Sequence, residues 1–150
     1  MITVREIDAS SEVELVAARM RATLVEVLGE ERGGSMYTRE WLVERVRYYV
    51  REGVVLVAER DGIAGHAFAR IDDGLGHFGT IYVEPGSRRL GVASALIAAI
   101  HEWLRARGVG RVRYFTGENN AKLVALFEKH GYATTARDGE ARMVELSRTL

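Results

Sequence analysis

The stretch EPGSRRLGVASALIAAI, from Glu84 to Ile100, decides how this chain folds. It contains the only proline of the sequence, then the adjacent Arg88 and Arg89, and then Gly91, which leads into an apolar, alanine-rich run. That run predicts a helix, and the first turn of any helix exposes backbone N–H groups at the positive end of the helix dipole. The stretch therefore predicts a loop and a helix N-terminus that can bind an anion.

The residue types around this turn suit a phosphate group. Gly91 and Ala93 remove side chains that would keep a phosphate away from the backbone, and Arg88 and Arg89 can add charge-assisted hydrogen bonds. Neither a P-loop nor a dinucleotide fingerprint is present, because the Gly-Lys-Ser/Thr ending and the GxGxxG pattern are missing. An ordinary surface loop with two solvated arginines explains the same residues, so the stretch alone leaves both interpretations open.

Hydrophobic periodicity places further elements on both sides of the stretch. Ser11 and Glu14 have the spacing of a capping box, Thr38 can cap a second helix, and residues 29–37 read as a flexible loop. Gly108 and the Asn119–Asn120 pair mark the end of the central helix and the start of the last one. We expect helices between residues 11 and 29, 38 and 51, 92 and 108, and 119 and 131, and strands at 2–7, 54–60, 63–72, 77–83, 111–116, 132–137 and 140–146.

The order of these elements predicts the fold class. Asp-Gly pairs at 61–62, 73–74 and 138–139 indicate tight turns, so the strands from 54 to 83 form an antiparallel meander and the last two strands form a hairpin. A right-handed crossover through the central helix makes strand 111–116 parallel to strand 77–83. We expect an α+β (three-layer α/β) fold, β-α-α-β-β-β-α-β-α-β-β, with helices on both faces of a mixed sheet and one domain over residues 1–150.

Composition excludes several classes of function. Lys plus Arg and Asp plus Glu both number 21, so the net charge of zero predicts neither a nucleic-acid partner nor an anionic membrane partner. The sequence has no cysteine, which excludes disulfides, thiolate metal sites and a cysteine nucleophile, and we expect no metal. The N-terminus lacks a signal-peptide core and no segment has the ~18 consecutive apolar residues of a membrane span, so a cytoplasmic location is expected.

Two segments together resemble the GCN5-related N-acetyltransferase (GNAT) family. Arg88, Gly91 and Ala93 match the Gln/Arg-x-x-Gly-x-Gly/Ala pattern of the family's motif A, and the preceding IYVEP resembles its fourth strand and the following turn. NNAKLVALFEKHGY, residues 119–132, resembles motif B, in which an Asn precedes a short helix ending in aromatic-Glu-Lys-x-Gly-aromatic. The two motifs occur in the family's order, separated by one predicted helix and one predicted strand.

The resemblance implies an acetyl-CoA-dependent N-acetyltransferase that acetylates a primary amine of a small molecule or peptide. It places the pyrophosphate on the motif A amides and the pantetheine arm between the splayed strands 77–83 and 111–116. It leaves a homodimer open. The cofactor-binding residues that it implies are Ile81, Tyr82, Val83, Arg88, Arg89, Leu90, Gly91, Val92, Ala93, Ser94, Asn120 and Phe127.

The family's usual catalytic side chains are absent from the matching positions. Members often use a Glu on the fourth or fifth strand as base and a motif B Tyr as acid, whereas this chain has Gly79, Thr80, Phe115 and Phe127 there. His77 is our candidate catalytic base, because histidine titrates near neutral pH. The weaker candidates are His66, Glu84 and Glu118, and each candidate also reads as an ordinary strand or solvated residue.

Three further expectations concern the surroundings of this site. Gly79 marks either a bulge with close ligand approach or a packing glycine. The acceptor is expected where the first two helices and their loop cover the sheet, near Glu26, Glu30, Glu31, Met36, Tyr37 and Trp41. The alternative functions are a CoA-binding sensor without turnover and a domain that binds no CoA.

Overall fold

One seven-stranded mixed sheet runs through the molecule, with helices on both faces. The computed structural model describes residues 1–34 and 37–150, and the strand order in the sheet is β1-β2-β3-β4-β5-β7-β6. The strands are β1 (Thr3–Glu6), β2 (Gly53–Glu59), β3 (Ile63–Asp72), β4 (Leu75–Val83), β5 (Arg111–Gly117), β6 (Ala133–Asp138) and β7 (Met143–Thr149). The helices are α1 (Val13–Gly29), α2 (Arg39–Glu52), α3 (Val92–Arg105) and α4 (Ala121–Lys129), with short turns η1 (Glu30–Gly34) and η2 (Pro85–Ser87).

The central strands pair as the sequence predicts. β2, β3 and β4 are consecutive antiparallel neighbours, and their hairpin turns place Asp61 at φ 56° and Asp73 at φ 52°, each followed by a glycine at positive φ. Positive φ at both central residues is the signature of the type I′ turn, which matches the strand twist. β4 and β5 are parallel, as the crossover through α3 requires.

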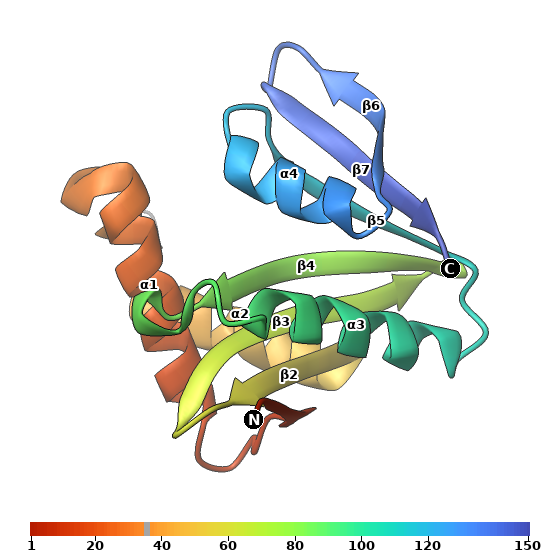
Figure 1. The fold of residues 1–150 in the computed structure, drawn as a ribbon. Helices are drawn as coiled ribbons and strands as arrows, with labels where there is room; N and C mark the ends of the chain where they lie inside the picture. The colour runs from red at the N-terminus through yellow and green to blue at the C-terminus, as the bar shows by residue number, and fades with distance from the viewer. Residues whose placement is uncertain (35–36) are drawn as a thin grey trace.

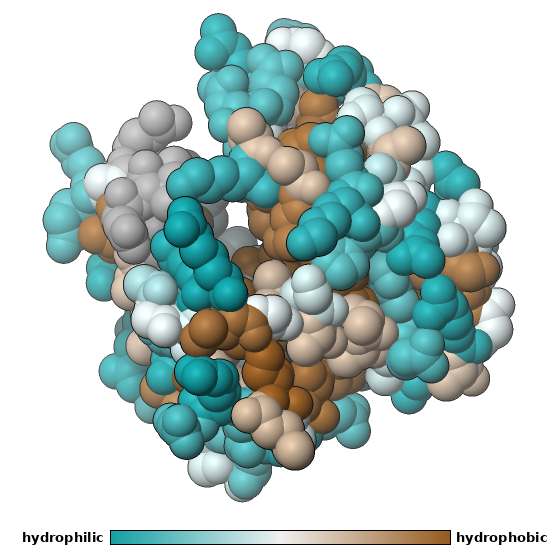
Figure 2. Space-filling model, viewed as in Figure 1, coloured by the Kyte–Doolittle hydropathy of each residue, from teal (hydrophilic) through white to brown (hydrophobic). Residues whose placement is uncertain are grey.

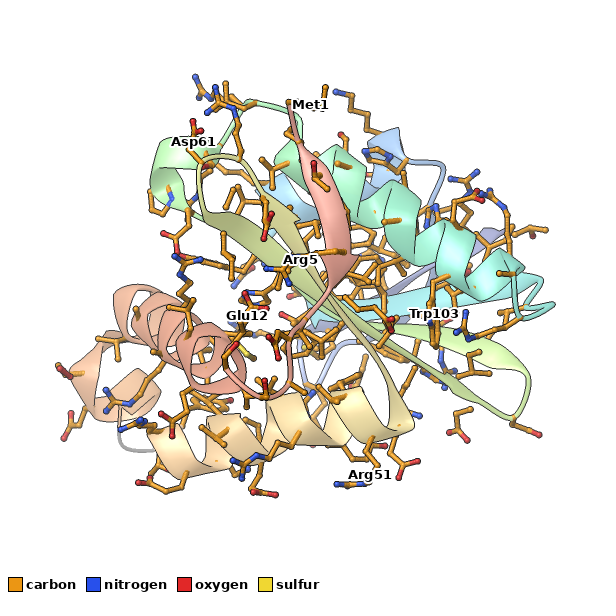
Figure 3. All side chains as sticks on the ribbon, turned by 90° about the horizontal axis from the view of Figure 1, so that it is seen from below. Met1, Arg5, Glu12, Arg51, Asp61 and Trp103 are labelled. Atoms are coloured by element: carbon orange, nitrogen blue, oxygen red, sulfur yellow. The ribbon has the colours of Figure 1, made fainter. Side chains whose placement is uncertain are left out.

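Helices cover both faces of the sheet (Figure 1), and a hydrophobic core lies on each face. α1 and α2 cover one face, where Val16, Leu42 and Val46 are fully buried together with Phe68 of β3. α3 and α4 contribute to the core on the other face, which contains Leu96 and Phe127 among its buried residues. Figure 3, seen from below, shows the sheet between the α1–α2 layer and α3. None of the helices in the described part of the chain is long and apolar enough to cross a membrane.

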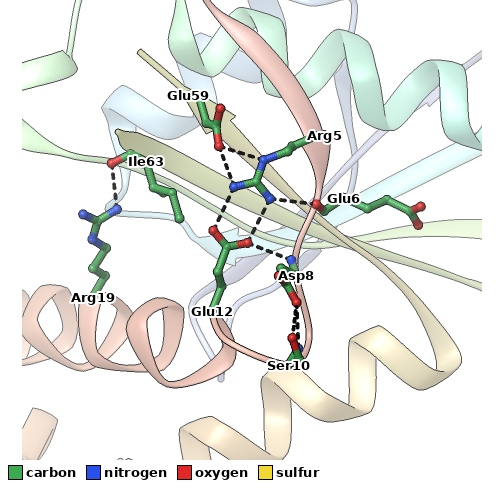
Figure 4. A network of polar contacts seen from close by, with 8 residues as sticks. All are labelled: Arg5, Glu6, Asp8, Ser10, Glu12, Arg19, Glu59 and Ile63. Carbon is green, nitrogen blue, oxygen red and sulfur yellow. Dashed lines mark hydrogen bonds and ion pairs between the residues drawn. The ribbon is translucent and has the colours of Figure 1, made fainter. Parts of the chain in front are cut away.

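The start of α1 differs from the predicted capping box. The helix begins at Val13 with Glu12 at the N-cap and no side-chain cap, while Glu14 forms an ion pair with Arg39 at 2.7 Å. The Glu12 carboxylate instead accepts two hydrogen bonds from Arg5, each 2.8 Å long, and one from the Asp8 N–H (Figure 4). The capping-box prediction is wrong because this charged pair, which no local spacing reveals, holds the chain before α1.

Of four smaller predictions, one is confirmed and three are corrected or only partly met. Part of the predicted loop 29–37 is a π-helical turn, η1, while residues 35–36 lie outside the described residues. Thr38 caps α2 by accepting from the Trp41 N–H at 3.2 Å, as predicted. Asn120 is the N-cap residue of α4 but its side chain makes no capping bond. The last hairpin turns over residues 139–142 rather than at Asp138-Gly139 alone, so β7 begins at Met143.

Candidate active site

The parallel strands β4 and β5 separate after a short paired segment. Their register covers only Gly76↔Val112, His77↔Arg113 and Phe78↔Tyr114, although β4 continues to Val83 and β5 to Gly117. In Figure 1 the two strands diverge toward the end where α3 begins. Figure 2, in the same orientation, shows a hollow at this place with hydrophobic residues in its wall. A gap therefore opens within the sheet between β4 and β5, as the resemblance to the GNAT family implied.

A bulge at Gly79 marks the point where the strands part. Phe68 of β3 pairs with Thr80 and its neighbour Ala69 pairs with Phe78, so Gly79 is the extra residue of β4. A bulge bends its strand and increases the local twist. A Cβ atom on Gly79 would lie 2.5 Å from the Tyr49 Oη and 2.7 Å from its Cζ. Gly79 is thus both a bulge glycine and a packing glycine, because α2 places Tyr49 against it.

The motif A loop presents free amides at the open end of the gap. Gly91, the N-cap of α3, has φ 85°, and the first bond into the helix is donated by the Ala95 N–H to the Gly91 carbonyl at 3.0 Å. The N–H groups of Val92, Ala93 and Ser94 precede that bond and so have no acceptor within the helix. Arg89 also has positive φ, 64°. Such strained non-glycine residues concentrate at functional loops.

Both arginines of the loop are exposed, and a hydrogen bond holds the Arg88 side chain. Arg88 donates from Nε to the Val83 carbonyl at 3.1 Å, which holds its side chain against the end of β4. Leu90 is 44% exposed, so the loop is open to solvent on this side. Together with the part of β4 that pairs with β3 but not with β5, this arrangement brings the predicted residues Ile81–Val83 and Arg88–Ser94 to one end of the gap.

The two motif B residues lie at different depths. Asn120, at the start of α4, donates from Nδ2 to the Thr116 hydroxyl at 3.4 Å, at the end of β5. Phe127 is completely buried and stacks on Tyr114 at 4.5 Å between ring centroids. Its ring also meets Phe78 and Tyr132 edge to face. Phe127 therefore belongs to the core around the gap, and its contact with a cofactor stays a prediction.

His77 lies at the closed end of the gap and is engaged by an arginine. It is 8% exposed, and Arg113 donates from Nε to its Nδ1 at 3.2 Å. Burial and the Arg113 charge lower the pKa of His77, and a ring that accepts at Nδ1 in its neutral form carries its proton on Nε2. That His77 is the base stays a prediction, with the added condition that Arg113 must first release Nδ1.

Of the three weaker base candidates, Glu118 is exposed at the end of β5, Glu84 is held in an ion pair and His66 is buried. His66 is fully buried against Phe68 and Tyr82, and within the described part of the chain neither ring nitrogen has a hydrogen-bond partner. Burial, with a smaller effect of Arg19, lowers the pKa of His66 to about 3. Glu84 forms an ion pair with Arg19 at 2.7 Å. Neither His66 nor Glu84 is a ready proton acceptor at the gap.

The predicted acceptor surface is only partly described. Tyr37 and Trp41 pack edge to face at 5.4 Å, and Trp41 is 46% exposed. Glu30 and Glu31 belong to η1. Met36 lies outside the described residues, so the acceptor surface stays a prediction.

Sequence reasoning missed a polar network that joins β5, β7 and β6. Glu145 of β7 pairs in register with Phe115, accepts from the Thr135 hydroxyl at 2.6 Å and forms a 3.5 Å ion pair with Arg113. The Phe115 ring is 47% exposed and lies 5.2 Å from the Arg113 guanidinium carbon. No local signal could have revealed this network, because it depends on which strand lies beside β5.

The sequence matches the model of the acetyltransferase (GNAT) family over residues 20–132. The chain therefore belongs to the GNAT family, and the prediction from motifs A and B is confirmed. Among curated proteins, the acetyltransferase GW6a of Oryza sativa subsp. japonica is 35% identical over 89 residues, which are 59% of this chain and 20% of that protein. Acetyltransferase ECA0875 of Pectobacterium atrosepticum is 36% identical over 83 residues, 53% of this chain and 57% of that protein. The matches thus span a fifth and just over half of these relatives.

Solved structures confirm the predicted fold class. The PaiA N-acetyltransferase of Thermoplasma acidophilum, determined in complex with coenzyme A, superposes with a TM-score of 0.82 at 15% identity and covers 100% of this chain and 99% of that one. YncA of Salmonella typhimurium, determined with acetyl-CoA, has a TM-score of 0.79 at 16% identity, covering 100% and 94%. At such identities the likeness shows the fold alone.

Proposed function

We propose that the chain is an acetyl-CoA-dependent N-acetyltransferase that acetylates a primary amine of a small molecule or peptide. The observation that carries this proposal is the meeting of two features at one end of the sheet. The gap between β4 and β5 opens there, and the N–H groups of the first turn of α3, which have no acceptor within the helix, lie there too. Family membership and the CoA-bound fold neighbours support the same reading.

Acetyl-CoA fits this arrangement by its chemistry. Its pyrophosphate would accept hydrogen bonds from the first turn of α3, from Val92 to Ser94, with Leu90 and Gly91 beside them. Arg88 and Arg89 would add positive charge to this site. The pantetheine arm would extend along Ile81–Val83 into the gap.

In the transfer, the neutral amine attacks the thioester carbonyl carbon, and the C–S bond then breaks. The nitrogen loses its proton to solvent or a base, and CoA leaves as a thiolate, which a thiol pKa of about 8.5 permits without a dedicated acid. Positioning both reactants in one gap can supply roughly 7–11 kcal/mol of barrier reduction. Because Arg113 donates to Nδ1 of His77, that nitrogen is not free to accept the proton of the amine. The proposed mechanism therefore relies on the positioning of the two reactants.

The test is release of CoA thiol during incubation of the protein with acetyl-CoA and a broad panel of primary amines. Turnover with at least one amine supports the proposal. Tight CoA binding without release from any amine would favour the second candidate, a CoA-binding sensor. That candidate is supported by four residues that stand where members of the family often carry catalytic side chains: Gly79, Thr80, Phe115 and Phe127. A homodimer, which the resemblance leaves open, is tested by sedimentation at several protein concentrations.

The binding site itself is tested at Gly91. Gly91→Glu places a carboxylate at the proposed phosphate position and should abolish CoA binding measured by calorimetry. Because Gly91 has φ 85°, any side chain there also strains the backbone by about 1 kcal/mol. Gly91→Ala is the matched control, since a Cβ at this position meets only the Ile2 Cδ1 at 3.9 Å. Equal binding by a folded Gly91→Glu variant and the parent would refute the assignment.

A further inference from the structure

A histidine outside motif A contacts the first turn of α3. His130, the C-cap residue of α4, places its Nε2 3.0 Å from the hydroxyl oxygen of Ser94, 36 residues earlier in the chain. Ser94 is the third residue of α3, and its N–H is one of those without an acceptor within the helix. The Ser94 hydroxyl and N–H therefore both lie at the proposed phosphate site, and His130 touches the hydroxyl.

The position of His130 is held from a third element. Arg148 of β7 donates from Nη1 to the His130 carbonyl at 2.7 Å, and the same Nη1 lies 3.4 Å from Nδ1 of His101. His101 in turn bonds through Nε2 to the Tyr132 hydroxyl at 2.7 Å. A network spanning α3, α4 and β7 thus fixes the backbone that carries His130.

The proton on His130 determines which way the Ser94 hydroxyl points. When Nε2 carries a proton, it donates to the Ser94 oxygen, and the hydroxyl proton is free to donate to another acceptor. When Nε2 lacks a proton, the Ser94 hydroxyl must donate to it instead. Only the first arrangement directs the hydroxyl proton toward a ligand oxygen at the start of α3.

We propose that His130 is a positioning residue for the CoA diphosphate, which orients the Ser94 hydroxyl toward a phosphate oxygen and adds a positive charge when protonated. This inference rests on the proposed function, because it presupposes the diphosphate at α3. The imidazolium always carries a proton on Nε2, whereas the neutral ring carries one there in only one of its two tautomers. Protonation of His130 therefore favours this orientation and adds a positive charge, so the affinity for the diphosphate depends on pH.

The charges around His130 set the direction of that dependence. Three groups act on the His130 ring through their charge: Lys129 of α4, Arg148 of β7 and His101 of α3. Burial and Arg148 lower the pKa of His101 to about 4. Burial, Lys129 and Arg148 lower the pKa of His130. A bound dianionic diphosphate favours the imidazolium and raises that pKa again. Binding of the diphosphate therefore takes up a proton, and the affinity for the diphosphate falls as the pH rises through the range in which His130 loses its proton.

The test measures the dissociation constant of 3′-dephospho-CoA by calorimetry between about pH 5.5 and about pH 8, the range in which histidine titrates. This probe retains the diphosphate but lacks the 3′-phosphate, whose own ionisation near pH 6 would obscure the result. The parent should bind roughly 3- to 10-fold more tightly at the acidic end, since one unit of pKa shift equals a factor of ten. His130→Gln keeps a side-chain donor without a titrating group, so its affinity should not change with pH.

A double-mutant cycle separates positioning from structure. Ser94→Ala, His130→Ala and the double variant should lose affinity non-additively, because both single changes remove the same hydroxyl orientation. Pantetheine, which has no phosphate, should bind all variants alike. Three results would overturn the inference while leaving the proposed function intact. They are the same pH dependence of affinity in the parent and in His130→Gln, additive losses of affinity in the double-mutant cycle, and a loss of affinity for pantetheine as large as that for dephospho-CoA. A folded parent that binds neither CoA nor dephospho-CoA would refute the proposed function itself.

Discussion

At the scale of single residues, Phe127 is the departure from the family pattern that the structure explains most directly. Its ring has no exposed surface and is packed by Tyr114, Phe78 and Tyr132. Phe127→Tyr would place a hydroxyl in this aromatic cluster, and burying a hydroxyl without a partner costs about 1–3 kcal/mol. We therefore expect the free energy of unfolding, measured by urea titration, to fall by that amount.

Phe115→Tyr is the matched control for this prediction. It makes the same chemical change on a ring that is 47% exposed, so its stability should stay within about 0.5 kcal/mol of the parent. A Phe127→Tyr variant as stable as the parent, with faster CoA release, would show that the new hydroxyl reaches the gap and protonates the thiolate.

At the scale of elements, the bulge in β4 depends on the packing of α2 across it. Gly79→Ala would bring a Cβ to 2.5 Å from the Tyr49 Oη and 2.9 Å from its Cε1. The Tyr49 ring is buried and packs on Phe68 at 5.2 Å between ring centroids, so it has little room to shift. Overpacking of this kind costs about 1–3 kcal/mol. We expect a loss of that size in chemical denaturation, accompanied by weaker CoA binding because the bulge lies where β4 and β5 part.

Gly86→Ala provides the corresponding control, since nothing lies within 4 Å of a Cβ on Gly86. Combining Gly79→Ala with Tyr49→Leu should destabilise by less than the sum of the single changes, because the clash is then relieved. Strict additivity would mean that Tyr49 is not what requires glycine in the bulge.

At the scale of the whole molecule, the histidines make stability depend on pH. All four, His66, His77, His101 and His130, have pKa values below the ordinary value, chiefly through burial. The unfolded chain therefore binds protons that the folded chain resists. The free energy of unfolding should be highest above about pH 6.5, the pKa of unfolded histidine. It should fall on acidification by up to about 1.4 kcal/mol per pH unit for each of His66 and His101, whose pKa values are lowered to about 3 and about 4.

Urea unfolding between about pH 7.5 and about pH 5 measures this slope above the ordinary range of carboxylates. The pKa values of Asp8 and Glu12 are lowered, so their contributions are lost only at lower pH. His66→Leu removes one buried titrating group and should flatten the slope, even if it changes the stability at neutral pH. An unchanged slope in that variant would show that His66 does not resist protonation.

The sequence by itself determined the element order, the main turns and the family. Asp61-Gly62 and Asp73-Gly74 predicted their hairpins because positive φ is a local requirement that few residues meet. Gly91 and Ala93 predicted an open helix N-terminus for the same reason, since free amides at the start of α3 follow from a few consecutive residues.

The tertiary structure alone decided where the sheet opens and what surrounds the opening. Strand register and packing between layers determine three features of this region. They are the three-pair contact of β4 with β5, the bulge at Gly79 against Tyr49 and the burial of Phe127. The contacts of Arg5 with Glu12 and of Ser94 with His130 likewise join different elements. Hydrophobic periodicity records which face of an element is buried, but it carries no information about which residue of another element lies opposite.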